Sequence, residues 1–148
     1  MRIGTPVEQF NISLAHLRSW KRGGSANEIT ERIPSLLVPI EANTQMQFSL
    51  HLRLNRGVWQ LATFGSPQFS QMWQRARKAG GQFLVQIESL ELAFAGRRVD
   101  GKLLLIPLFS DVRLHLEEGK EQPAEKILDG LVEAAVAYKP SVLNSRAR

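Results

Sequence analysis

Hydrophobic and polar residues alternate most regularly over residues 46–55. The even-numbered positions Phe48, Leu50 and Leu52 are apolar, and the odd-numbered positions Ser49, His51 and Arg53 are polar. This alternation predicts a strand with one buried face. Arg56-Gly57 predicts a turn, and residues 58–64 predict a returning strand.

A helical period replaces the alternation after Ser66-Pro67, which is a typical helix start. The apolar face of this predicted helix carries Phe69, Met72, Trp73 and Ala76, and Gly80-Gly81 ends it. A second amphipathic helix is predicted over residues 123–138. Between the two helices, strands are predicted over residues 83–94, 103–109 and 112–116, with a hairpin turn at Asp100-Gly101.

The N-terminal third of the chain has a less regular pattern. Residues 5–21 fit a helix, and a strand over residues 11–17 is the alternative. Residues 33–40 are apolar but contain Pro34 and Pro39, which lack a backbone donor, so they predict an edge strand or an irregular segment. Antiparallel hairpins dominate the whole pattern, which favours a mainly β fold of the α+β class.

Composition narrows the class of protein. A chain of 148 residues with 43% hydrophobic content is long enough for one domain with a core. The absence of cysteine excludes disulfides, thiolate nucleophiles and cysteine-based zinc sites. No apolar run resembles a secretory signal or a membrane span, so we expect a cytoplasmic protein with no membrane partner.

The net charge of +5 favours attraction to polyanions, and its distribution is uneven. No Asp or Glu occurs between Glu41 and Glu88, a stretch that contains both arginines and aromatic residues. Binding of single-stranded nucleic acid requires cations along the phosphates and aromatic rings that stack on bases. The predicted binding residues are Arg53, Arg56, Trp59, Phe64, Arg75, Arg77, Lys78, Arg97, Arg98 and Lys102.

Structural roles compete with this interpretation. Phe69 and Trp73 have the spacing of core residues on a helix. The cluster Arg75, Arg77 and Lys78 also suits the negative end of a helix dipole. Arg97 and Arg98 flank a predicted hairpin tip, where basic residues are common for solubility.

The order and spacing of these segments resemble those in the bacterial single-stranded-DNA-binding protein family. The resemblance covers about residues 46–117. It rests on four segments in order: Phe48-Ser49-Leu50, the strand from Trp59 to Gly65, a helix ending in a basic-Gly element, and the Asp100-Gly101 hairpin. It implies a five-stranded Greek-key OB-fold barrel that binds single-stranded DNA or RNA in DNA replication, recombination or repair.

This resemblance divides the chain into segments and has clear departures. Residues 1–45 would be an extension holding the first strand or a helix, residues 46–117 the barrel, 118–138 a helix and 139–148 a basic tail. The acidic tail of the family is absent. Trp59 and Phe64 are five residues apart, so strict alternation puts them on opposite faces unless the strand contains a bulge.

Catalysis is not expected. His16, His51 and His115 are scattered, and no glycine-rich loop precedes a helix to hold a phosphate. Glu88 and Glu91 fall on opposite faces of the predicted strand and would not form a carboxylate pair. We therefore expect a protein without metal or cofactor.

The alternative hypothesis is a protein-binding module, such as an assembly factor or a dimeric secretion chaperone, with no nucleic-acid ligand. In that hypothesis the apolar stripe of the 123–138 helix could be the seam of a homodimer. It would otherwise pack on the barrel as part of the core. The stripe is formed by Ile127, Leu128, Leu131, Val132 and Ala135.

Overall fold

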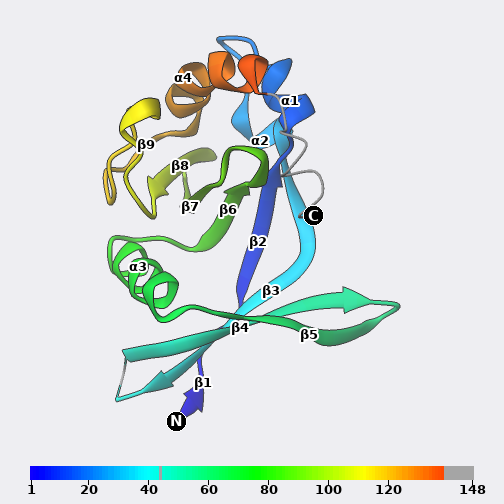
Figure 1. Cartoon of the computed structure of the whole chain (residues 1–148), viewed down its shortest axis with the longest axis vertical. Coiled ribbons are helices and arrows are strands. Elements are labelled where there is room, and N and C mark those ends of the chain that lie inside the picture. Colours follow the sequence, from blue (N-terminus) through cyan, green and yellow to red (C-terminus); the bar gives the residue numbers. More distant parts are fainter. Residues whose placement is uncertain (44, 139–148) are drawn as a thin grey trace.

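The computed structural model describes residues 1–43 and 45–138, which form one mixed, open β-sheet with helices on both faces (Figure 1). The strands are β1 (Arg2–Ile3), β2 (Val7–Ile12), β3 (Thr30–Ala42), β4 (Gln45–Asn55), β5 (Val58–Gly65), β6 (Phe83–Ile87), β7 (Leu92–Val99), β8 (Lys102–Pro107) and β9 (Gln122–Pro123). The helices are α1 (Leu14–Arg18), α2 (Ala26–Ile29), α3 (Pro67–Lys78) and α4 (Ala124–Ala137). The mainly β, α+β class is confirmed.

Two antiparallel halves make up the sheet. The order along it is β5-β4-β3-β2-β6-β7-β8-β9, and β1 pairs with β3 beside β2. The halves meet where β2 and β6 run parallel, while the other pairings are antiparallel. Because β5 and β9 lie at opposite ends, the sheet stays open. The closed OB-fold barrel is therefore not confirmed.

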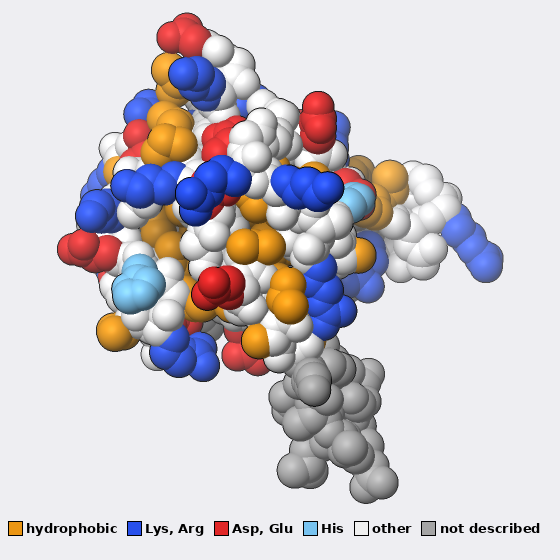
Figure 2. All heavy atoms as spheres, turned by 90° about the horizontal axis from the view of Figure 1, so that it is seen from above, with side chains coloured by type: hydrophobic (Ala, Val, Ile, Leu, Met, Phe, Trp, Pro, Cys, Tyr) orange, Lys and Arg blue, Asp and Glu red, His pale blue; other side chains and the backbone are white. Residues whose placement is uncertain are grey.

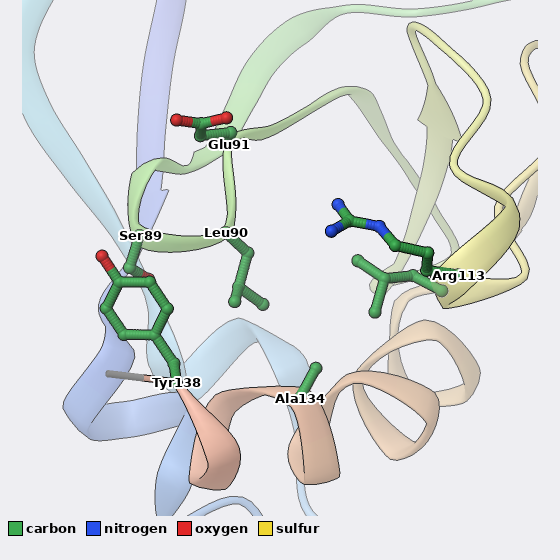
Figure 3. A pocket seen from close by; sticks show the side chains of 7 residues that line it. Ser89, Leu90, Glu91, Arg113, Ala134 and Tyr138 are labelled. Carbon is green, nitrogen blue, oxygen red and sulfur yellow. The ribbon is translucent and has the colours of Figure 1, made fainter. Parts of the chain in front are cut away.

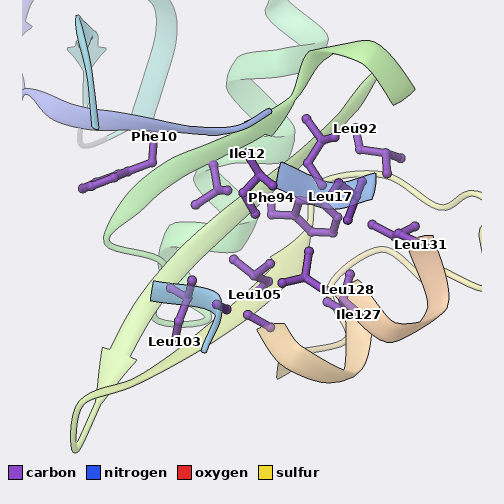
Figure 4. Close-up of a cluster of buried hydrophobic side chains, with 14 of the residues drawn as sticks. Phe10, Ile12, Leu17, Leu92, Phe94, Leu103, Leu105, Ile127, Leu128 and Leu131 are labelled. Carbon is purple, nitrogen blue, oxygen red and sulfur yellow. The ribbon is translucent and has the colours of Figure 1, made fainter. Parts of the chain in front are cut away.

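One core lies on the face of the sheet that helices α1, α2 and α4 cover (Figure 4). Phe10, Ile12 and Phe94 from the strands pack there with Leu17 from α1 and Leu128 from α4. A hydrogen bond adds to this packing, since the Nε1 group of Trp20 donates to the Oδ1 atom of Asp129 over 2.9 Å. This core covers the β2-β6-β7-β8 part of the sheet.

A second core lies on the opposite face, beneath α3. Trp73 and Ala76 of α3 pack there against Leu37 of β3, Met46 of β4 and Leu84 of β6. The helix begins as expected, because the Oγ atom of Ser66 accepts a hydrogen bond from the amide of Phe69. The sequence prediction that Trp73 is a core residue is confirmed by its complete burial.

The apolar stripe of α4 belongs to the first core. Ile127, Leu128, Leu131 and Ala135 are all buried within the chain itself. This burial is what a helix packed on the sheet requires, so the structure supports the core role of the stripe.

The N-terminal segment differs from the predicted helix over residues 5–21. Residues 7–12 form β2, which pairs with β3 on one side and β6 on the other. Helix α1 begins only after Ser13, whose side chain accepts a hydrogen bond from the amide of His16. Pairing with two strands overrides a helical period that rests on few positions.

The prolines of β3 do not place it at an edge. It is an interior strand, with β1 and β2 on one side and β4 on the other. Pro34 lies where the register with β2 shifts, and Pro39 lies between the residues that pair with β2 and those that pair with β1. These are positions where a missing donor disturbs the ladder least.

Two other predicted strands are interrupted. The predicted strand over residues 83–94 breaks at a 3-10 turn, Glu88–Leu90, and Glu91 adopts the left-handed conformation with a φ of 55°. Residues 112–114 form another 3-10 turn, because the side chain of Asp111 accepts a hydrogen bond from the amide of Leu114. The predicted basic tail at 139–148 lies outside the described residues.

Candidate binding surface

The β4–β5 hairpin extends away from the rest of the molecule (Figure 1). Pairing between β3 and β4 stops at Ser35 and Arg53, so the tip of the hairpin is supported only by its own two strands. Strand β5 is the end of the sheet, and its residues 58–64 are all exposed. Its outer backbone edge therefore has no neighbouring strand within the described chain.

A bulge in β5 changes the direction of its side chains. His51 of β4 lies opposite Thr63, whereas the next residue, Leu52, lies opposite Leu61. Ala62 is thus an extra residue with no partner in the ladder. A bulge of this kind reverses the alternation on either side of the inserted residue.

This bulge brings the two exposed aromatic residues to the same face. Trp59 lies opposite Leu54, and Phe64 lies opposite Leu50. Because Leu50 and Leu54 have the same parity, and because residues directly opposite each other share a face, Trp59 and Phe64 do as well. Strict alternation had predicted the reverse.

The same pairing rule applied to β1, β3, β4 and β5 defines one continuous surface. Each member is apolar, and we call this surface the apolar face: Ile3, Leu36, Val38, Ile40, Phe48, Leu50, Leu52, Leu54, Trp59, Leu61 and Phe64. None of these residues belongs to either core cluster of the described chain, but Val38 and Ile40 of β3 are buried, with exposed fractions of 7% and 9%.

Five side chains of the apolar face are strongly exposed. The exposed fractions are 71% for Ile3, 38% for Leu54, 42% for Trp59, 51% for Leu61 and 62% for Phe64. No described helix covers this surface, because α1, α2 and α4 pack over the other half of the sheet and α3 packs on the opposite face. A contiguous exposed apolar patch on a protein surface indicates an interaction site.

The opposite face of the hairpin is polar, and its base is covered by α3. The His51 ring lies 5.7 Å from that of Phe69, and its Nε2 atom is 3.2 Å from the Oγ atom of Ser49. Burial lowers the pKa of His51, because it disfavours the charged imidazolium. Gly65 fits closely against Ser49, which is fully buried. His51 therefore serves packing between β4 and α3.

Three of the arginines predicted to bind phosphate form ion pairs instead. The shortest contacts are 2.6 Å from Arg75 to Glu118, 3.2 Å from Arg77 to Glu41 and 2.5 Å from Arg97 to Glu121. The hydrogen bond from Arg97 to Glu121 also raises the pKa of that guanidinium. These partners come from far along the chain, so the acid-free stretch of sequence is not an acid-free surface.

A fourth predicted arginine, Arg98, lies over two aromatic rings. Its guanidinium carbon is 5.3 Å from the ring centroid of Phe10 and 4.9 Å from that of Phe83. Within residues 1–43 and 45–138, no ion pair engages the other four predicted cations, Arg53, Arg56, Lys78 and Lys102.

The ten predicted residues do not converge on one surface. Trp59 and Phe64 lie on the apolar face, Arg53 lies on the opposite face of the hairpin, and Arg56 lies in its turn. The others lie on α3 and around the β7–β8 turn. Figure 2 shows basic and acidic side chains interspersed over the body, and basic side chains near the end of the projecting hairpin. A continuous basic groove is not seen on that face.

The hollow shown in Figure 3 lies at the far end of the molecule from the hairpin. It has a volume of about 340 Å³ and is lined by Ser89, Leu90, Glu91, Arg113, Leu114, Ala134 and Tyr138. In the described part of the chain, no cluster of three or more His, Asp or Glu side chains could hold a metal. No described helix is long and apolar enough to cross a membrane.

Sequence patterns missed most of the apolar face. The alternation of Leu50, Leu52 and Leu54 predicted a buried side of a strand, but it did not reveal that this side would be left uncovered. The exposure of Ile3 and Leu61 depends in the same way on where the helices pack.

No family model matches the chain, and no curated protein or solved structure matches it either.

Proposed function

We propose that this chain is a non-catalytic protein-binding module whose partner docks on the apolar face. The observation that carries the proposal is the exposure of Trp59, Leu61 and Phe64 side by side on a projecting edge of the sheet. Burying a large apolar side chain contributes about 1.5–3 kcal/mol. Removal of these side chains from water would therefore provide a substantial part of a binding free energy.

The chemistry of the apolar face favours a polypeptide over a nucleic acid. Its members are aliphatic and aromatic, and none is Lys or Arg. The buried centre of an interface between proteins is apolar and poor in charge, whereas a single strand requires cations for its phosphates and aromatic rings for its bases. Three of the predicted cations are engaged by carboxylates as well.

Site-specific photo-cross-linking in cells would test this proposal. A photoreactive phenylalanine analogue at position 61 or 64 is expected to form adducts with the same identifiable polypeptide. The matched control is position 58, because Val58 is 59% exposed on the same strand but lies on the opposite face. Adducts with nucleic acid, equal adducts from position 58, or no polypeptide adduct at all would contradict the proposal.

Single-stranded nucleic-acid binding is the second candidate function. The bulge supports it, because it lets Trp59 and Phe64 stack on bases from one face. Arg53 and Arg56, on the same hairpin, are free of ion pairs with the described acids. An open strand platform would replace the closed OB-fold barrel, and the role would be in DNA replication, recombination or repair.

Fluorescence polarisation with labelled oligo-dT, compared with matching duplex, would test this second candidate. Each stacked base contributes about 1–3 kcal/mol, so replacing Trp59 and Phe64 together with Ala should weaken binding at least tenfold. Four free cations predict a slope of log affinity against log salt no steeper than about −3. Unchanged affinity of the double variant, or equal binding of duplex, would exclude stacking on this face.

A further inference from the structure

We propose that the partner on the apolar face is a second copy of this chain, packed face to face around a two-fold axis. The two sheets would form a sandwich at the β3–β4–β5 end of each molecule. This inference rests on the proposed protein-binding function and names its partner.

The alternation of apolar and polar residues in the hairpin is typical of two strands that bury one face away from water. Leu50, Leu52 and Leu54 alternate with polar residues on β4, and the bulge keeps Leu61 and Phe64 in line with them. Antiparallel sheets with this alternation normally pack the apolar side on another layer. No described helix covers the hairpin part of this side, and a second molecule would supply the missing layer.

A uniformly apolar surface is complementary to itself. A two-fold interface brings the same patch of both subunits together, so any charge on it would face its own copy or a near neighbour. The apolar face has no charge, and Glu8 beside Leu36 marks its border, paired with Arg32 over 3.4 Å. Homodimer interfaces are also more apolar than those between different proteins that separate readily.

The strongly exposed side chains supply more than half of the area that each partner of a stable dimer buries. Aromatic side chains present about 150–250 Å² each and aliphatic ones somewhat less, so the five strongly exposed members leave on the order of 500 Å² of apolar surface. The partly buried Leu36, Phe48, Leu50 and Leu52 extend it. Stable interfaces bury about 800 Å² per partner, a value within reach once the hairpin backbone is included.

Face-to-face packing explains the observations better than edge pairing. The free edge of β5 could add a strand from a second copy, but that arrangement would leave both apolar faces in water. Packed sheets bury side chains between layers about 10 Å apart, with strands crossing at roughly 30°. In such a sandwich Trp59, Leu61 and Phe64 enter the dry layer, while Arg53 and Gln60 stay outside.

Sedimentation equilibrium of the purified full chain over a wide concentration range would test the inference. The wild type is expected to have twice the mass of one chain. Leu61→Glu and Phe64→Glu should each weaken the dimer at least tenfold, with an unchanged far-ultraviolet circular dichroism spectrum. The matched control, Val58→Glu, adds the same charge to the same strand on the opposite face and should remain dimeric.

Each contrary outcome overturns a distinct statement. A wild type that is monomeric at every concentration, or a Val58→Glu variant that dissociates as readily as Leu61→Glu, would exclude the second copy as partner. If position 61 in that case cross-links to a different, identified polypeptide, the protein-binding function stands and only its partner is wrong. If position 61 cross-links to no polypeptide, both proposals fail.

Discussion

Leu128→Lys is expected to abolish the folded state, whereas Val136→Lys on the same helix should leave it intact. Leu128 is fully buried in the core between α4 and the sheet, and Val136 is 63% exposed. An unpaired ammonium group buried among apolar side chains carries a large desolvation cost. Losses above about 4 kcal/mol arise from such changes, and total stabilities are about 5–15 kcal/mol.

Urea unfolding followed by circular dichroism would measure this difference. Val136→Lys is expected to change the free energy of unfolding by less than about 0.5 kcal/mol, because the site is exposed. The pair of variants also separates two roles of the α4 stripe. A Leu128→Lys protein that is folded but dissociated would mean that the stripe is a seam between subunits and not part of the core.

Trp73→Ala should cost about 3–5 kcal/mol, the usual range for removing a buried aromatic side chain. Trp73 is fully buried and holds α3 against Leu37, Met46 and Leu84 of the sheet. Its loss would leave a large cavity between the helix and the strands. The midpoint of urea unfolding should fall accordingly.

Trp59→Ala is the matched control for this prediction, since it removes the same side chain from an exposed position. We expect it to change stability by less than about 1 kcal/mol. Trp73→Phe, which keeps an aromatic ring, should recover most of the loss. Equal destabilisation by Trp59→Ala and Trp73→Ala would contradict the assignment of one tryptophan to the core and the other to a binding surface.

Local patterns predicted the middle of the chain well. The β4–β5 hairpin and the α3 and α4 helices occur close to the predicted residues, because each has a regular period and distinct end signals such as Ser66-Pro67. The period was too short to decide β2, where a parallel pairing with β6 determined the outcome. Parallel pairing joins distant segments and has no local signal.

The candidate site was predicted in part. Trp59, Phe64, Arg53 and Arg56 lie exposed on one hairpin, as a binding role requires. The cluster on α3 was interpreted from its neighbours in sequence, which contain no acid. Its neighbours in space do, because Glu41 and Glu118 come from β3 and the loop before β9.

Local sequence patterns are enough to predict that the chain has a mainly β fold, that its middle is a hairpin with one apolar side, and that two helices have apolar faces. Period and end signals carry this information locally. Which of these apolar surfaces are covered depends on how the elements pack in three dimensions. The α4 stripe is buried by the sheet, while the apolar face of the hairpin is left exposed, because the helices pack elsewhere. The bulge at Ala62 was likewise decided by pairing between strands, and it places Trp59 and Phe64 on one face.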